Sequence, residues 1–257
     1  MKTTKFLLVI DIGNTAISFG VMKNLELVGN DHLDTVFLKN RIQKPLEDIL
    51  SKIKRKFPKI EKVVICSVVP SLTKTVQSVI KKYLNLQVLV VGQDIIVPIK
   101  NKYDNPNQVG QDRLVGAFAA KALYGFPCII IDFGTAITFD VVSAKGSYEG
   151  GIIIPGIRLS AESLFQKTAL LPRVETIDAP KTLVGKSTKE SILSGLFFGY
   201  GAMSAGLIDR ISQEIKGKPK VIITGGYTHL MKKFLIGKID KVDRDLVFKG
   251  LALLANR

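Results

Sequence analysis

Residues 6–22 read FLLVIDIGNTAISFGVM, and residues 127–142 read PCIIIDFGTAITFDVV. With one residue deleted, the two segments share Asp-x-Gly, a following Thr-Ala-Ile and a second apolar run. Each copy is typical of an apolar strand, a tight glycine turn and a second strand that begins with hydroxyl residues. Because one copy lies near the start of each half of the chain, the repeat predicts two related α/β lobes.

The remaining pattern agrees with this duplication. In the first half we expect strands at 6–12, 15–22, 25–29, 62–67 and 87–91, and helices at 43–56 and 71–84. In the second half we expect strands at 127–132, 135–143, 147–154 and 219–224, and helices at 157–166, 188–214 and 243–256. Three adjacent strands followed by alternating helix and strand favour mixed sheets with flanking helices. We expect the lobes to be residues 1–113 and 114–257, joined where the loop at 105–114 feeds a helix of small residues.

The composition is that of a globular protein with anionic partners. Of the 257 residues, 46% are apolar and 23% charged, which suits a large buried core. The net charge of +15 favours nucleotides, nucleic acid or membrane phosphates. The densest basic segment, KIKRKFPKIEK at 52–62, is more typical of a solvated helix end than of a nucleic-acid patch, because no aromatic interleaving accompanies it. We expect no nucleic-acid partner.

Cysteine usage and hydropathy favour a cytoplasmic protein. Cys66 and Cys128 sit in apolar runs, which predicts buried thiols in a reducing compartment. Lys2 and Lys5 precede an apolar run that mimics a signal peptide, but Asp11 ends that run early. Residues 191–208 carry no charge and are nearly long enough to span a bilayer, yet their glycines and serines favour a buried, closely packed helix. We therefore expect no membrane partner.

The first glycine turn has the composition of a phosphate-binding site. Asp11 ends an apolar strand, so its carboxylate emerges at a sheet edge where a hydrated Mg²⁺ could sit. Gly13 would let the backbone approach a phosphate, and residues 14–18 add amide and hydroxyl donors. The alternative is an ordinary hairpin, because Gly-Asn is a good turn dipeptide. The second copy, at 132–135, favours the phosphate site: two opposed turns would clamp a polyphosphate.

A third segment could complete a nucleotide site. The apolar run at 221–224 ends in Gly225 and Gly226, which could lie flat against a purine. Taken alone, a Gly-Gly pair is more often a simple turn.

In this order the three segments resemble the phosphate-one, phosphate-two and adenosine segments of the sugar kinase, actin and Hsp70 superfamily. Within it, the chain resembles type III pantothenate kinases over essentially its whole length. The resemblance rests on a collinear set of motifs: DIGNT at 11–15, CSVVP at 66–70, YDNPNQVGQDR at 103–113, DFGTAITFD at 132–140, GGIIIPG at 150–156, and GKST at 185–188 with SG at 194–195.

This resemblance implies a fold and an activity. The fold would be two duplicated ribonuclease H-like lobes with the nucleotide in the cleft between them, assembled as a homodimer. The activity would be ATP-dependent phosphorylation of the 4′-hydroxyl of pantothenate, the first step of coenzyme A biosynthesis. The family also requires a monovalent cation, K⁺ or NH₄⁺, in addition to ATP and Mg²⁺.

The resemblance further assigns roles to individual residues. ATP would be bound by Asp11, Ile12, Gly13, Asn14, Thr15, Ala16, Ile17, Ser18, Thr135, Gly225 and Gly226. Pantothenate would be bound by Tyr103, Gly110, Gln111, Asp112, Arg113 and Thr188, with Asp112 as the catalytic base. Asp11 would hold Mg²⁺ through water, and Asp132 would hold the monovalent cation. From its position alone, Asp132 would instead suggest a second magnesium carboxylate.

The role of Asp112 is physically reasonable. Phosphoryl transfer through a loose transition state requires mainly that the nucleophile be oriented, so an ordinary Asp pKa would suffice. Arg113 would keep Asp112 ionised and could pair with the carboxylate of pantothenate. The alternative is that Asn105-Pro106 simply starts a helix and Asp112 is a polar residue of its first turn. In that case Asp112 could be replaced with little loss of activity.

The segment GKST at 185–188 is not a P-loop. Pro180 stands where the motif needs glycine, and the preceding VETIDAP is a poor strand. Ser187-Thr-Lys-Glu190 instead predicts a capping box that opens the long helix. Type III pantothenate kinases usually have Asn-Thr here, so Thr188 inherits a pantothenate contact while Ser187 departs from the pattern.

Two other functions remain open. One is a kinase for another small hydroxylated acid, and the other is a non-catalytic transcription accessory protein on the same fold. Asp11, Asp112 and Asp132 are all present, which favours an enzyme, because a binding protein has no need of the set. His32 and His229 have no metal-ligand spacing, and we expect both to be structural or surface residues.

Overall fold

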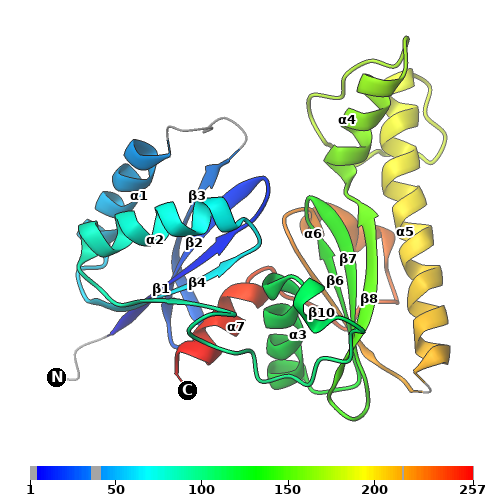
Figure 1. Cartoon of the computed structure of the whole chain (residues 1–257). Helices are drawn as coiled ribbons and strands as arrows, with labels where there is room; N and C mark the ends of the chain where they lie inside the picture. Colours follow the sequence, from blue (N-terminus) through cyan, green and yellow to red (C-terminus); the bar gives the residue numbers. More distant parts are fainter. Residues whose placement is uncertain (1–4, 36–41, 216, 257) are drawn as a thin grey trace. The chain divides into compact units, whose positions relative to one another are not determined.

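The computed structural model describes residues 5–35, 42–215 and 217–256 of the 257-residue chain (Figure 1). Its internal contacts divide the chain into two compact units. Unit 1 comprises the described residues of 1–99, 104–119 and 245–257, and unit 2 comprises residues 100–103 and the described residues of 120–244.

Unit 1 is built on a five-stranded mixed sheet of order β3-β2-β1-β4-β5. The strands are β1 (Phe6–Ile12), β2 (Ala16–Lys23), β3 (Glu26–Asp34), β4 (Ile60–Ser67) and β5 (Val88–Val90). The pairs β1–β2 and β2–β3 are antiparallel, whereas β1–β4 and β4–β5 are parallel. The two halves of the sheet therefore combine a hairpin meander with crossover connections, as expected for a mixed sheet.

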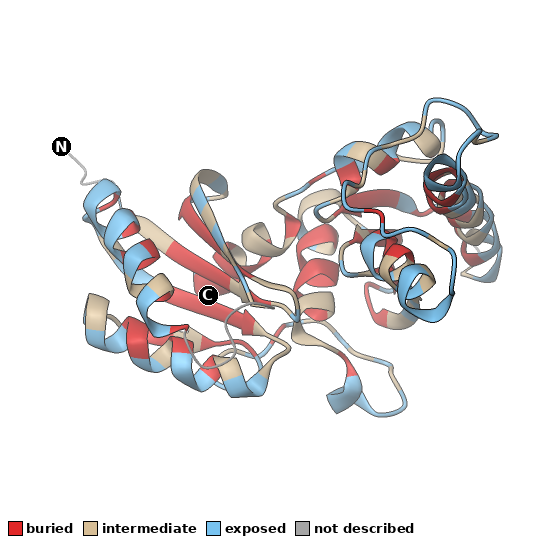
Figure 2. Cartoon of the chain, turned by 90° about the horizontal axis from the view of Figure 1, so that it is seen from above, coloured by how far each residue is buried: buried red, intermediate tan, exposed pale blue. Residues whose placement is uncertain are grey.

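Helices cover both faces of this sheet. α1 (Gln43–Lys56) and α2 (Pro70–Leu84) pack against each other and share one core with alternate residues of β1, such as Leu8 and Ile10. α7 (Leu246–Ala255) contacts β1, β2 and β4, and Gly20 lies directly against its Phe248. Because both faces are covered, the central strands read as continuous apolar runs instead of alternating ones. The buried strand residues of unit 1 lie in β1, β2, β4 and β5, whereas β3 at the edge has none, and the helices alternate buried and exposed residues (Figure 2).

Unit 2 repeats this topology. Its sheet has the order β10-β9-β6-β7-β8. Read in reverse, as β8-β7-β6-β9-β10, this order corresponds strand for strand to β3-β2-β1-β4-β5 of unit 1. The strands are β6 (Cys128–Phe133), β7 (Ala136–Val142), β8 (Tyr148–Pro155), β9 (Lys220–Thr224) and β10 (Lys241–Val242). The pairs β6–β7 and β7–β8 are antiparallel, and β6–β9 and β9–β10 are parallel, again as in unit 1. The duplication expected from the sequence is confirmed.

The remaining helices connect these strands. They are the 3₁₀ helix η1 (Pro106–Gln108), α3 (Gln111–Tyr124), α4 (Ile157–Lys167), α5 (Thr188–Glu214), α6 (Thr228–Met231) and the 3₁₀ helix η2 (Lys232–Phe234). α4 and α5 pack together, and their apolar side chains join one core with β6, β7 and β9. Ser187 caps α5 by accepting from the Glu190 N–H at 3.2 Å, and Glu190 Oε2 accepts from the Lys186 N–H at 2.8 Å. The Ser187 half of the predicted capping box is confirmed, whereas Glu190 accepts from the residue before Ser187 and not from Ser187 itself.

By length and composition alone, α5 could cross a membrane, and 44% of its most apolar window is buried in the structure. Its inner side chains, among them Ile192, Phe197 and Ile208, belong to the core of unit 2. α5 thus packs as a core helix along one face. Cys66 and Cys128 are free and buried, as expected.

Some elements differ from the sequence expectation. Asn105 caps η1 by accepting from the Asn107 N–H, so the Asn-Pro pair opens a 3₁₀ turn and α3 begins later, at Gln111. β3 extends to Asp34, and α6, η2 and β10 had no sequence signal. The contacts also group residues 114–119 and α7 with unit 1, whereas we expected them in the second lobe. α7 follows unit 2 in sequence but packs on the sheet of unit 1.

The packing of α7 on α3 gives a stability prediction. A Cβ at Gly250 would lie 2.6 Å from Val115 Cγ1 and 2.8 Å from the Val115 carbonyl oxygen, so Gly250→Ala forces the helices apart. We expect it to lower the free energy of unfolding by about 1–3 kcal/mol, as overpacking does. Gly116→Ala on α3 is the matched control, because no atom lies within 4 Å of its Cβ position. There the gain in helix propensity, about 0.5–1 kcal/mol, should dominate. Urea unfolding measures both, and equal effects would contradict the packing.

Candidate active site

The glycine turn at residues 11–15 of unit 1, predicted to bind phosphate, is a tight, braced hairpin. The Gly13 N–H donates to the Ala16 carbonyl at 2.9 Å and closes the turn between β1 and β2. Thr35, just past the end of β3, braces it from the side. The Thr35 N–H donates to the Thr15 carbonyl and its hydroxyl donates to the Asn14 carbonyl, both at 2.9 Å. With these carbonyls held, the turn keeps a fixed shape with Asn14 exposed at its tip.

Asp11 and Asp112, which are far apart in sequence, both lie near Cys66. Asp11 is half-buried near the end of β1, opposite Ser18 on β2 and Cys66 on β4. Burial raises the pKa of the Cys66 thiol well above its usual value, and the negative charges of Asp11 and Asp112 raise it further. A Cβ at Gly110 would collide with Asp112 Oδ1, so the carboxylate folds back over that glycine. Unit 1 thus brings the two predicted carboxylates to one end of its sheet.

Burial governs the electrostatics of Asp112. Its Oδ1 accepts from the Arg113 N–H at 2.8 Å in the first turn of α3. Burial raises the pKa of Asp112, and this outweighs the opposing effects of that hydrogen bond and of the Arg113 charge. The pKa of Asp112 is therefore raised and not ordinary, because the carboxyl group loses more solvation than Arg113 and the hydrogen bond replace.

The glycine turn at residues 132–135 of unit 2, the second predicted phosphate site, has the same construction. The Gly134 N–H donates to the Ala136 carbonyl at 3.2 Å, and Asp132 on β6 lies opposite Thr138 on β7. The Thr135 carbonyl accepts from the Gly156 N–H at 3.0 Å, so the end of β8 braces this turn. A Cβ at Gly156 would collide with that same carbonyl oxygen. The glycine that closes the GGIIIPG motif therefore permits the contact.

The glycine pair after β9 packs directly on this turn. Gly225 has φ of +92°, and a Cβ there would collide with Asp132 Oδ1 and lie 2.8 Å from the Phe133 nitrogen. An L side chain is therefore excluded both by the backbone conformation and by the close approach. The Tyr227 N–H donates to the Phe133 carbonyl at 3.0 Å, which fixes the segment. Gly226 is exposed, with open space at its Cβ position. Unit 2 thus brings its predicted ATP and cation residues together.

The predicted pantothenate residues divide between the units. Gly110, Gln111, Asp112 and Arg113 belong to unit 1, where the Gln111 side chain lies against Gly92. Tyr103 and Thr188 belong to unit 2. Tyr103 packs against Tyr148, and Thr188 is exposed as the first residue of α5.

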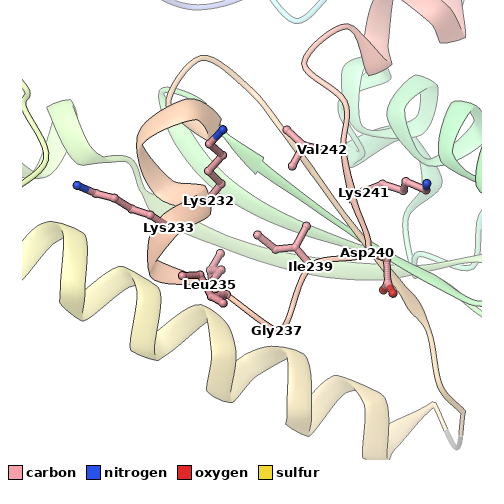
Figure 3. Close-up of a pocket in the computed structure, with 9 residues that line it drawn as sticks. Lys232, Lys233, Leu235, Gly237, Ile239, Asp240, Lys241 and Val242 are labelled. Carbon is pink, nitrogen blue, oxygen red and sulfur yellow. The ribbon is translucent and has the colours of Figure 1, made fainter.

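A pocket of about 380 Å³ lies elsewhere in unit 2, between η2 and β10 (Figure 3). Leu235, Ile239 and Val242 are among its lining residues, together with Lys232, Lys233 and Lys241. None of the predicted site residues lines it. Figure 3 shows Lys233 and Lys241 pointing to opposite sides, so the cations do not converge on one point. The candidate active site therefore follows the motifs and not this pocket.

Sequence reasoning missed three supporting features. These are Cys66 beside both carboxylates, the bracing of the first turn by Thr35, and the contact of Gly156 with Thr135. Cys66 and Gly156 lie inside motifs that the sequence singles out, so their importance was visible but their contacts were not. Thr35 had no sequence signal, because its role arises from the pairing of β2 with β3.

Comparison with known proteins identifies the family. The family model described as type III pantothenate kinase matches residues 7–210. A type III pantothenate kinase of Persephonella marina is 44% identical over 250 residues, which cover 94% of this chain and 95% of that protein. The chain belongs to the type III pantothenate kinase family. A type III pantothenate kinase of Halalkalibacterium halodurans is 39% identical and covers 96% of this chain and 98% of that protein.

Solved structures agree on the fold of this family member. A Campylobacter jejuni protein described as a Baf family transcriptional activator has a TM-score of 0.61 at 20% identity, and the match covers 97% of both chains. A ROK family glucokinase of Streptomyces griseus, in complex with glucose and AMPPNP, has a TM-score of 0.57 at 13% identity and covers 98% of this chain and 100% of that one. At such identities the likeness concerns the fold alone, and it confirms the predicted resemblance in fold to sugar kinases.

The burial of Asp112 gives a prediction for stability. The pKa of Asp112 is higher in the folded protein than in the unfolded chain. The contribution of its carboxyl group to stability is therefore fully present below the unfolded pKa and is lost as the pH rises through the folded pKa. At pH 7.5 the ionised carboxylate thus costs stability, so Asp112→Asn should raise the melting temperature, by about 2–4 °C for each kcal/mol. The gain should vanish near pH 3, below the unfolded pKa of about 4.

Thermal unfolding of the protein without ligands at both pH values measures this. Asp48→Asn on α1 serves as the control, because the Asp48 side chain is 56% exposed and pairs with Lys44 at 2.8 Å, so its replacement should not raise the melting temperature at pH 7.5. A lower melting temperature for Asp112→Asn at pH 7.5 would mean that the carboxylate is stabilised by its surroundings, contrary to the burial argument.

Proposed function

We propose that this protein transfers the γ-phosphoryl group of ATP to the 4′-hydroxyl of pantothenate, the first step of coenzyme A biosynthesis. Membership of the type III pantothenate kinase family supports the reaction. The observation that carries the assignment of residues is the convergence of Asp11 and Asp112 on Cys66. A phosphoryl transferase needs one carboxylate for the metal and another for the acceptor, and the charges of both act on the Cys66 thiol although their motifs lie in separate parts of the chain.

Each unit would supply its own part of the ATP site. In unit 1, residues 11–18 would bind phosphate through the braced turn. In unit 2, Thr135 would contact the phosphates and Gly225 and Gly226 would accommodate the adenosine. Gly226 supports this, because it is exposed with open space at its Cβ position and a nucleotide can approach its backbone closely. Gly225 instead allows the segment to pack on the turn that carries Asp132.

Asp112 would act on the acceptor. The bond between the γ-phosphorus and the bridging oxygen breaks, the pantothenate hydroxyl oxygen bonds to phosphorus, and the hydroxyl proton passes to Asp112. In a loose transition state most of the work is positioning. The raised pKa of Asp112 nevertheless makes it a stronger proton acceptor than an ordinary aspartate. Arg113 would pair with the pantothenate carboxylate, and Tyr103, Gly110, Gln111 and Thr188 would line the pocket.

The carboxylates also fit the expected ions. Mg²⁺ prefers one or two carboxylates completed by water and phosphate oxygens, and Asp11, half-buried near the end of β1, offers that chemistry. Bound there, Mg²⁺ would neutralise charge on the ATP phosphates. Asp132 would hold K⁺ or NH₄⁺ through a carboxylate that glycine backbone approaches closely.

A homodimer in the cytoplasm completes the proposal. Gly195, Gly199, Ala202 and Gly206 are exposed on α5. Their spacing of three and four residues places them on one face of the helix, where small residues permit close packing with a second copy. Leu159 and Phe165 on the neighbouring α4 are also exposed apolar residues.

The alternative of a transcription accessory protein rests on the description of the Campylobacter jejuni protein, which shares only the fold. Against it stand the retained Asp11, Asp112 and Asp132. A kinase for another small hydroxylated acid differs only in the acceptor, and a panel of acceptors would distinguish it from a pantothenate kinase.

The catalytic assignment is tested by ADP release. We expect pantothenate-dependent release with the wild type, and a kcat at least about 10²-fold lower for Asp112→Asn, the range of general-base catalysis. Asp48→Asn should retain wild-type rates. If Asp112→Asn matched the wild type, the aspartate would be only a polar residue of the first turn of α3. Release with a different hydroxy acid, but not with pantothenate, would favour the alternative kinase.

The cation assignment predicts a dependence on monovalent ions. ADP release should increase when K⁺ or NH₄⁺ replaces choline at equal ionic strength, and Asp132→Asn should lose that increase because it removes the charge that holds the ion. Full wild-type activity in choline buffer would remove the assignment of Asp132. An increase that survives Asp132→Asn would place the cation elsewhere.

A further inference from the structure

Four residues of the chain belong to a different unit from their neighbours on both sides. Residues up to 99 and residues 104–119 belong to unit 1, whereas Lys100–Tyr103 belong to unit 2. We refer to Lys100–Tyr103 as the strap. It ends in Tyr103, the first residue of the YDNPNQVGQDR motif, which leads to Asp112.

The strap is bound to the first residue of β8 on both sides. The Tyr148 N–H donates to the Lys100 carbonyl, and the Lys102 N–H donates to the Tyr148 carbonyl, both at 2.9 Å. Asn101 forms a parallel bridge with Tyr148. Because β8 is an edge strand of its sheet, the strap pairs with backbone groups that would otherwise lie open.

Side chains add to this attachment. Lys102 Nζ lies 3.0 Å from Glu149 Oε1, and the Tyr103 N–H donates to Asn101 Oδ1 at 3.0 Å. The Tyr103 ring lies 6.5 Å from the Tyr148 ring, centroid to centroid. It also passes close over Gly150, where a Cβ would lie 3.6 Å from Tyr103 Cε2. The orientation of Tyr103 thus depends on β8 and above all on Tyr148.

Tyr148 is itself held by a buried carboxylate. Its side chain is fully buried, and its hydroxyl donates to Asp140 Oδ1 at 2.8 Å. The Thr138 hydroxyl donates to Asp140 Oδ2 at 3.2 Å. Asp140 is only 3% exposed, and a buried carboxylate is costly unless it is fully hydrogen-bonded.

The shared fold does not require this carboxylate. In unit 2, Thr138 is opposite Asp132, and Asp140 lies two residues after Thr138. In unit 1, Ser18 is opposite Asp11, and Gly20 lies two residues after Ser18. The two positions are therefore equivalent in the duplicated hairpins, and unit 1 has a glycine where unit 2 has a buried aspartate. A residue that is costly and dispensable for the fold requires another explanation.

We propose that Tyr148, held by Asp140, is a positioning residue for acceptor binding. It docks the strap on β8 and through it fixes Tyr103 in the orientation that contacts pantothenate. This inference rests on the proposed function, in which Tyr103 lines the pantothenate pocket, and adds Asp140 and Tyr148 as its supports. The alternative is that the pair only fills the core of unit 2.

Tyr148→Phe tests this, because it keeps the ring and removes the hydroxyl. We expect the KM for pantothenate to rise about five- to tenfold, the equivalent of one buried hydrogen bond, while kcat and the KM for ATP stay within about twofold. The matched control is Tyr124→Phe. The Tyr124 hydroxyl donates to Asp243 Oδ2 at 2.6 Å, a second tyrosine–aspartate pair of unit 2 with a buried carboxylate and no contact with the strap. It should lose thermal stability without a change in the KM for pantothenate.

A double-mutant cycle separates positioning from a general effect on stability. If Tyr148 acts through Tyr103, Tyr148→Phe should cause no further rise in KM in a Tyr103→Ala background. Asn101→Ala, which removes the acceptor for the Tyr103 N–H at a half-buried site, should reproduce the rise in KM. It decides the question if Tyr148→Phe does not fold.

The possible outcomes separate this inference from the proposed function. An unchanged KM for pantothenate in the folded variants, equal changes for Tyr124→Phe, or additive effects in the cycle would overturn the positioning role while leaving an active kinase. A wild type that releases no ADP with pantothenate would remove the proposed function and this inference with it.

Discussion

The register of the two central strands is the constraint on which the site depends. β1 and β6 each lie between an antiparallel neighbour and a parallel one, and each carries an aspartate near its end. This register sets Asp11 between Ser18 and Cys66, and Asp132 between Thr138 and Thr224. Since side chains alternate between the faces of a sheet, a slip of one residue would turn each carboxylate to the opposite face. The continuous apolar runs that precede both aspartates stabilise the register, because helices cover both faces of the sheet in unit 1.

The two turns are braced by different parts of the chain, although their own geometry is the same. In unit 1 the brace is Thr35, just past the end of β3, and in unit 2 it is Gly156, just past the end of β8. These strands are equivalent in the duplicated topology, so each turn is held by the third strand of its own meander. Both braces bond to carbonyls of the turn, which leaves its shape set before any ligand binds. A preformed site of this kind avoids the entropy cost of ordering a loop on binding.

The sequence predicted most of the fold because its strands and long helices have strong apolar periods. The sequence did not predict elements that depend on few or exposed residues, such as the two-residue β10 and the short α6. It also did not predict packing between distant segments, such as that of α7 on the sheet of unit 1. The same limit applies to the site. Motif spacing identified Asp11 and Asp112, but not that both lie near Cys66 or that burial outweighs the charge of Arg113. Desolvation is a property of the folded surroundings, so no reading of neighbouring residues could supply it.

Comparison of the two hairpins shows where the duplicated units have diverged. Both keep a carboxylate, a glycine turn and hydroxyl residues, which are the groups that the phosphate chemistry needs. They differ at the next inward position, where Gly20 in unit 1 leaves room for Phe248 and Asp140 in unit 2 accepts from the Tyr148 hydroxyl. In unit 1 the position therefore serves the packing of a helix, whereas in unit 2 it supports the residue on which the strap is bound. Phosphate chemistry accounts for the groups that the two hairpins share. The attachment of Tyr103 accounts for the buried carboxylate of Asp140, which packing alone would not retain.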